Sequence, residues 1–87
     1  MNFLITPKIN GKLTRLKVQL IYKTDTVERF EVIARNKTLV LETNRMLFMN
    51  KGLKHRKGQW KLISGHLNYP YHLEKIHEAI DEKLEMM

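Results

Sequence analysis

RLKVQLIYK at residues 15–23 and RFEVIAR at residues 29–35 decide the fold of this 87-residue chain. Apolar residues expected to face inward recur at every second position: Leu16, Val18, Leu20 and Tyr22 in the first stretch, and Phe30, Val32 and Ala34 in the second. A period of two with β-branched and aromatic residues is typical of half-buried strands. Thr24-Asp25 between the stretches favours a tight turn. The two stretches therefore predict neighbouring antiparallel strands.

Further strands are expected on both sides of this pair. The alternation continues at 39–42 and again at 60–63, where Gly65 ends the strand. Asn10-Gly11 is a favoured hairpin dipeptide and predicts a turn between residues 3–9 and the residues from Lys12 onward. Pro7 lacks a backbone donor, so a first strand there belongs at an edge. The strands thus fall within 3–65, and the sequence leaves open whether 3–9 forms one of them.

The C-terminal residues predict a helix over about 70–86. Pro70 suits a first helical turn, with Asn68 or Tyr69 as the cap. At about 100° per residue, one apolar face is shared by Leu73, Ile76, Ile80, Leu84 and Met87. We therefore expect one α+β domain spanning 1–87: a small antiparallel β-meander of four or five strands, covered on one face by a single C-terminal helix.

Charge is the strongest functional signal. The chain holds sixteen Lys and Arg against nine Asp and Glu, a net charge of +7. Residues 66–87 contain two basic and five acidic residues, so the positive charge belongs to residues 1–65. A basic body with an acidic end is compatible with polyanion binding, self-association or solubility.

A long basic loop is expected at 44–58, and loops of this length are often functional. No acidic residue occurs from Arg45 to Lys61, and glycines at 52 and 58 flank a KHRK run and would let backbone approach a phosphate. The candidate nucleic-acid or anion contacts are Arg45, Lys51, Lys54, His55, Arg56, Lys57 and Lys61, with Arg15 and Lys17 as a secondary stripe. The run Met46–Met49 is expected to plug one end of the core. The sequence leaves open whether the loop is functional or only such a plug.

Two further features favour self-association. Four aliphatic residues point away from the predicted core, and acidic residues form a stripe on the helix; the members are Ile21, Ile33, Val40 and Ile63, and Glu74, Glu78 and Glu82. Tyr22, Phe30 and Trp60 all fall on the inward register. The outward face then offers charge without an aromatic stacking platform, which favours phosphate contact over base stacking.

The residues of catalysis and metal binding are sparse. There is no cysteine, and His72 and His77 lie about 140° apart on the helix, so they do not form an i, i+4 metal pair. A His77–Asp81 hydrogen bond is the simpler expectation. Glu28 sits among neighbours typical of a solvated strand position. With no catalytic constellation, we expect neither an enzyme nor a cofactor or metal site.

The sequence thus predicts a small, basic, non-enzymatic binding module that contacts nucleic acid through phosphates. The alternative is a protein-interaction or homodimeric module with no nucleic-acid role. A membrane-surface role would need Leu47 and Phe48 exposed and is not favoured. Apolar runs are short and residues 1–8 do not resemble a signal peptide, so we expect a cytoplasmic protein. The ligand, the choice between RNA and DNA, the oligomeric state and the biological process stay open.

Overall fold

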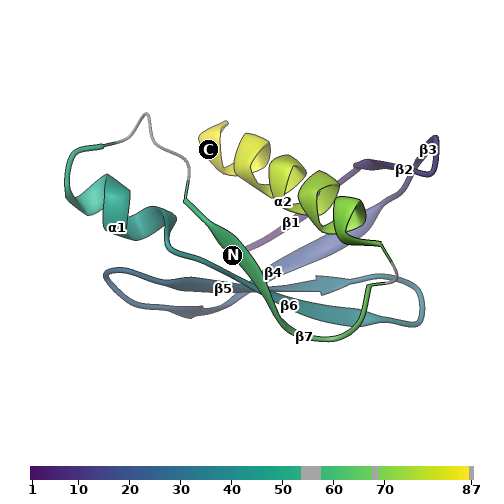
Figure 1. The fold of residues 1–87 in the computed structure, drawn as a ribbon, viewed down its shortest axis with the longest axis horizontal. Helices are drawn as coiled ribbons and strands as arrows, with labels where there is room; N and C mark the ends of the chain where they lie inside the picture. The colour runs from purple at the N-terminus through teal and green to yellow at the C-terminus, as the bar shows by residue number, and fades with distance from the viewer. Residues whose placement is uncertain (54–57, 68, 87) are drawn as a thin grey trace.

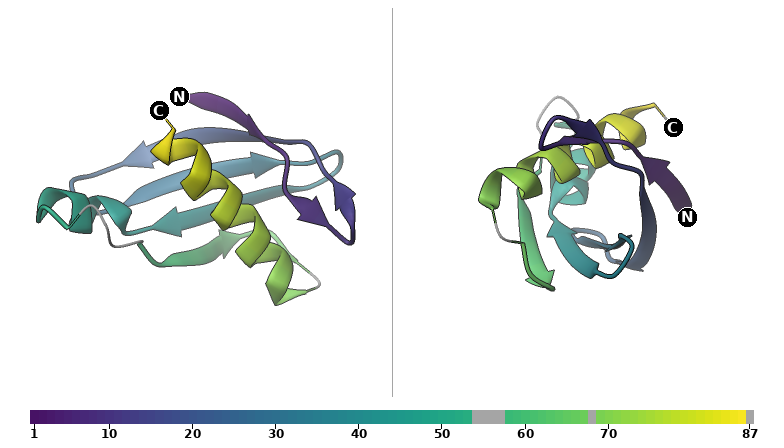
Figure 2. Two further views of the ribbon diagram at one scale, coloured as in Figure 1. Left: turned by 90° about the horizontal axis from the view of Figure 1, so that it is seen from above. Right: turned by 90° about the vertical axis from the view of Figure 1, so that its right-hand side faces the viewer.

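The computed structural model describes residues 1–53, 58–67 and 69–86. Its elements in chain order are β1 (Asn2–Ile5), β2 (Lys8–Ile9), β3 (Lys12–Leu13), β4 (Leu16–Lys23), β5 (Glu28–Ile33), β6 (Thr38–Thr43), α1 (Arg45–Asn50), β7 (Trp60–Ser64) and α2 (Pro70–Glu85). Five strands form an antiparallel sheet in the order β1-β4-β5-β6-β7. The sheet curls around α2, which lies on its concave side (Figures 1 and 2). The predicted α+β meander with a C-terminal covering helix is confirmed.

The N-terminal residues form an edge strand and a separate small hairpin. β1 pairs with β4 through Asn2–Gln19 to Ile5–Leu16, and β2 pairs with β3. Asn10 and Gly11 both have positive φ, 52° and 76°, as a type I′ turn requires. Pro7 lies between β1 and β2, outside either ladder.

The core lies between the concave face of the sheet and α2. The buried apolar side chains are Phe3, Ile5, Leu16, Val18, Phe30, Val32, Leu39, Leu41, Ile76, Ile80 and Leu84. The i, i+4, i+8 spacing of Ile76, Ile80 and Leu84 is what places them on one face of α2. Leu73 packs against this core while partly exposed. Tyr69 is the N-cap residue; Asn68 and Met87 lie outside the described residues.

The structure corrects the predicted position of Tyr22. Leu20 pairs with Phe30 but Tyr22 pairs with Arg29, so Ile21 is an extra residue in a β-bulge. One inserted residue moves the following side chain to the opposite face of a sheet. Tyr22 therefore lies on the outer, convex face beside Arg29 and is 48% exposed. A similar register shift on β7 leaves Ile63 as its extra residue, because Leu41 pairs with Leu62 and Val40 with Ser64.

The predicted loop at 44–58 contains a second helix. α1 lies at one end of the sheet, opposite the β2–β3 hairpin (Figure 1). Its side chains are partly buried at most, Met49 is exposed, and none of them belongs to the core cluster. The Met46–Met49 run therefore does not plug the core as predicted. Within the described ranges, neither α1 nor α2 is long and apolar enough to cross a membrane.

Candidate polyanion-binding surface

Arg45, the first predicted anion contact, is engaged in a buried ion pair. Its Nε lies 2.6 Å from Oε1 of Glu28, and its Nη2 donates to Oε2 at 3.3 Å. The Glu28 side chain is 1% exposed, contrary to the solvated position expected from its neighbours, and that of Arg45 is 20% exposed. A buried carboxylate needs a paired cation. Arg45 therefore serves the fold by fixing the start of α1 to β5.

Gly58 also has a structural role. A Cβ atom at this position would lie 2.5 Å from the backbone nitrogen of Arg45. The backbone N–H of Gln59 then donates to Oδ1 of Asn44 at 2.7 Å. The chain thus returns to β7 in close contact with the start of α1, and only a residue without a side chain fits there.

The other predicted anion contacts in and after this loop lie in different surroundings. Lys51 is exposed just after α1, and Lys61 lies on β7 with its Nζ 3.3 Å from Oε1 of Glu42. The compact run of Lys54, His55, Arg56 and Lys57 lies outside the described residues. The contacts predicted there stay predictions.

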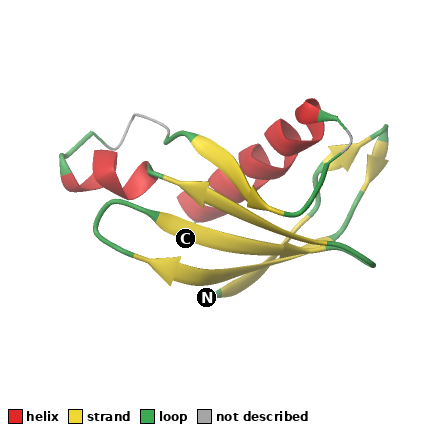
Figure 3. Ribbon diagram, turned by 60° about the horizontal axis from the view of Figure 1, so that its bottom comes forward, coloured by secondary structure: helices red, strands yellow, loops and turns green. Residues whose placement is uncertain are grey.

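A row of interacting side chains crosses the outer face of the sheet. Figure 3 shows the strands from this side, with α2 behind them. Strand register places Tyr22, Arg29, Glu42 and Lys61 side by side on β4, β5, β6 and β7. The Arg29 guanidinium lies over the Tyr22 ring, 5.0 Å from its centroid, and its Nε donates to Oε2 of Glu42 at 2.8 Å. The bulge has therefore supplied an aromatic ring to a face that the sequence predicted to lack one.

Glu42 is held ionised by this row. The hydrogen bond from Arg29 lowers the pKa of Glu42, with a smaller contribution from Lys61, while burial acts in the opposite direction. The carboxylate neutralises part of the charge of two cations. Arg29 and Lys61 are thus less available to an external anion than an unpaired cation.

Among the described residues, a group of unpaired cations lies at the other end of the sheet. Lys17 pairs with Ile33, which pairs with Thr38, so the start of β4 and the β5–β6 turn share one end. Four exposed cations project there, which we call the end cluster: Arg15, Lys17, Arg35 and Lys37. None of the ion pairs among the described residues includes a member of the end cluster.

The strands that carry the end cluster lie close together. Neighbouring strands lie about 4.8 Å apart, so β4 and β6 are separated by about 10 Å. The nearest acid on the outer face is Glu31, which is partly buried and paired in register with Gln19 and Val40. The predicted secondary stripe, Arg15 and Lys17, is thus joined by two cations from a different part of the chain.

The predicted self-association residues fall into two separate groups. Ile21 and Ile63 are 45% and 43% exposed on the outer face, where Ile33 and Val40 are partly buried. The acids Glu74, Glu78 and Glu82 are exposed on α2, which covers the opposite face of the sheet. The two groups therefore cannot belong to one contact surface.

Among the described histidines, His77 packs against an aromatic side chain of the sheet. The His77 ring stacks on Trp60 with centroids 5.9 Å apart and planes at 7°, and its Nδ1 is buried without a hydrogen-bond partner. Oδ2 of Asp81 accepts a hydrogen bond from Nε1 of Trp60 at 3.1 Å. The predicted bond from His77 to Asp81 is not made by Nδ1. In the part of the chain that the structure describes, no three His, Asp or Glu side chains are grouped to hold a metal ion.

Comparison with known proteins gives no relative from which a function could be transferred. No family model matches the chain, and no curated protein or solved structure matches it. The functional argument therefore depends on the chemistry of the surface itself.

Proposed function

We propose that this chain is a non-enzymatic nucleic-acid-binding module that holds phosphates at the end cluster. The observation that carries the proposal is the exposure of Arg15, Lys17, Arg35 and Lys37 without an acidic partner among the described residues. Unpaired cations gathered on one surface are the electrostatic footprint of polyanion binding. The guanidinium groups can each contact two phosphate oxygens, and the lysines add point charges.

The outer face offers a path for a single strand beyond the end cluster. Arg35, just beyond β5, follows Arg29 by six positions, a span of about 20 Å at the rise of an extended strand. At the far end of this path lies Tyr22, whose ring is half exposed and braced by the Arg29 guanidinium. Aromatic rings beside cations are the usual stacking platforms of single-strand-binding proteins. We therefore assign phosphate contact to the end cluster and base stacking to Tyr22, with no base-reading role.

The proposal is tested by fluorescence anisotropy with labelled single-stranded RNA, single-stranded DNA and duplex DNA over a salt series. The test variant replaces Arg15, Lys17, Arg35 and Lys37 by Gln. The control removes the same number of positive charges elsewhere, by replacing the exposed residues Lys8, Lys12, Lys23 and Lys51 by Gln. Because both variants have the same net charge, any difference between them reports position.

For a single strand, each lost phosphate contact should lower the slope of log K against log salt by about 0.7, so the test variant should lose about 2 to 3 units. The control should keep most of the slope. Equal losses of salt slope in both variants would mean that net charge alone attracts the ligand. So would nucleic acid that binds no more tightly than heparin, the non-specific polyanion control. The proposal would then be wrong.

A further inference from the structure

The two edges of the sheet differ in how they are protected. β7 carries a bulge at Ile63 and a lysine at position 61, two devices that discourage pairing with another strand. β1 has the uncharged sequence Asn-Phe-Leu-Ile and pairs without a bulge. Its exposed side chain Leu4 is 50% accessible. β1 is thus the edge that is open to another strand.

The hydrogen-bond phase of β1 shows which backbone groups are free. The backbone N–H of Leu20 donates to the carbonyl of Met1 at 3.0 Å, which makes Met1–Leu20 a hydrogen-bonded pair. Such pairs alternate along an antiparallel ladder, so Phe3 and Ile5 also bond to β4. The N–H and C=O groups of Asn2 and Leu4 therefore point outward, and those of Thr6 continue the series.

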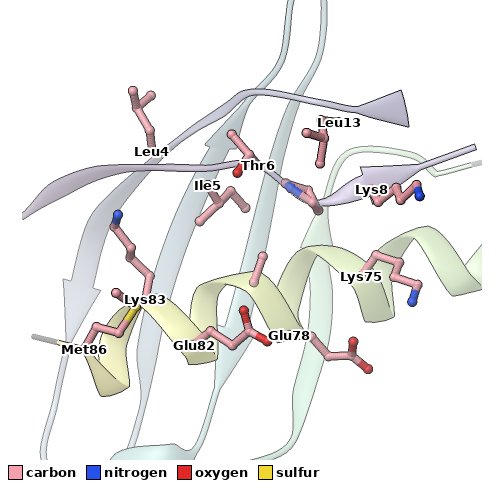
Figure 4. Close-up of a pocket in the computed structure, with 12 residues that line it drawn as sticks. Leu4, Ile5, Thr6, Lys8, Leu13, Lys75, Glu78, Glu82, Lys83 and Met86 are labelled. Carbon is pink, nitrogen blue, oxygen red and sulfur yellow. The ribbon is translucent and has the colours of Figure 1, made fainter. Parts of the chain in front are cut away.

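A groove of about 340 Å³ runs along this free edge, between β1 and the flank of α2 (Figure 4). Apolar residues contribute at both sides, including Leu4 and Leu13 from the N-terminal segment and Ala79 and Met86 from α2. Leu13 and Met86 are among the most exposed large apolar residues described, at 76% and 80%. The groove thus combines unpaired backbone groups with uncovered apolar side chains.

The charges on the α2 flank indicate what fills the groove. Lys75 and Lys83 lie there with Glu78 and Glu82, so each sign occurs twice on one side of the helix. Two antiparallel copies of such a flank, offset so that Lys75 of each copy faces Glu82 of the other, form two ion pairs across the two-fold axis. A foreign strand would have to bring a matching pattern, whereas a second copy of this chain already has one. An isologous interface requires this kind of self-complementarity.

We infer that β1 pairs antiparallel with β1 of a second copy about a two-fold axis, while the flanks of α2 meet above the joined edges. The free backbone groups select the register with Leu4 opposite Leu4 of the second copy and Asn2 opposite Thr6. The two sheets become one continuous sheet. The acids at 78 and 82 belong to this interface, and the outer aliphatic residues of the sheet do not.

A cysteine cross-link tests the register. The chain has no native cysteine. Facing residues of a hydrogen-bonded pair have Cα atoms about 5.5 Å apart, within the range that a disulfide spans. Leu4→Cys should therefore form a covalent dimer under mild oxidation. Ile63→Cys, equally exposed on the other edge strand, is the matched control. Equal cross-linking of both variants, or none of Leu4→Cys, would overturn the inference.

Charge reversal tests the helix flank independently of any change to β1. The double variant Glu78→Lys/Glu82→Lys makes the flank wholly basic, and Lys75→Glu/Lys83→Glu makes it wholly acidic. In sedimentation velocity, each should self-associate about tenfold more weakly than the native chain or worse, and an equimolar mixture should recover dimer. A native chain that stays monomeric over the whole concentration series, or variants that dimerise like it, would refute the proposed interface.

Discussion

The buried pair of Glu28 and Arg45 supports a quantitative prediction. In Arg45→Met, the Glu28 carboxylate, which is 1% exposed in the native structure, loses its cation. Removing one partner of a buried pair costs about 3–5 kcal/mol. Because one-fifth of the Arg45 side chain is exposed, water can reach the site, and we expect the lower value, about 3 kcal/mol. That is a large part of the roughly 4–13 kcal/mol typical of a domain of this size.

The assay is urea unfolding followed by the fluorescence of Trp60, the single tryptophan of the chain. Its ring is partly buried and stacked on His77, so unfolding changes its surroundings. With a urea dependence of about 1 kcal/mol per M, the midpoint of Arg45→Met should fall by about 3 M. The double variant Glu28→Gln/Arg45→Met should recover part of this loss, since no buried charge remains without a partner.

The matched control is Lys61→Met, which breaks an ion pair at an exposed position. The Lys61 side chain is 69% exposed and its partner Glu42 keeps Arg29, so the urea midpoint should not change measurably. If Arg45→Met lowers the midpoint by no more than about 0.5 M, the carboxylate is solvated after the change, and the reasoning from burial is refuted.

Three further predictions follow from the sheet. Tyr22→Leu should weaken binding of single-stranded nucleic acid by about tenfold without changing the salt slope, whereas Tyr69→Leu, equally exposed beside α2, should have no effect in the same anisotropy assay. Gly65→Ala should lower the free energy of unfolding by about 2 kcal/mol or more in urea, because φ is +96° and the new Cβ would lie 2.7 Å from a backbone oxygen of the facing strand. The folded-state pKa of Glu42 lies below its ordinary value of 4.5, so the Arg29 contact stabilises the fold above that pH and the benefit is lost as the pH falls through the folded pKa. The midpoint difference between the native chain and Arg29→Met should therefore shrink on acidification, and a difference that is constant with pH would contradict the assignment.

Local periodicity was sufficient for the main elements. The alternation at 29–33 and the helical spacing of Ile76, Ile80 and Leu84 both describe a single face that must leave water. Asn10-Gly11 forms its turn because both residues tolerate positive φ. These signals lie within a few residues of one another, so the sequence carries them without knowledge of the fold.

The position of Tyr22 could not be predicted in the same way. The stretch RLKVQLIYK alternates without interruption, and nothing in it marks Ile21 as a bulge. In the structure, the Glu28–Arg45 pair occupies the inner side of the sheet near the end of β4, and Tyr22 turns outward. Arg45 follows Glu28 by seventeen residues, so this pairing depends on how β5 and α1 meet.

The candidate site, too, was only partly predictable from the sequence. Sequence reasoning favoured residues 54–57 because their charges are consecutive, and it counted Arg45 among the ligand contacts. The end cluster instead joins Arg15 and Lys17 to Arg35 and Lys37 through the register of β4 with β5 and of β5 with β6. The bulge at Ile21 shifts this register by one residue, so counting outward from the predicted turn at Thr24-Asp25 would have misplaced it.

The sequence by itself determined the α+β class, the four strands within 16–65, the covering helix and the basic character of residues 1–65, since these depend on composition and on short-range periodicity. The tertiary structure alone decided which cations form ion pairs with buried or surface carboxylates and which stay unpaired. It also decided that β1 is the unprotected edge. The physical reason is that pairing, burial and edge exposure depend on distances between residues far apart in the chain, and those distances exist only once the sheet has formed.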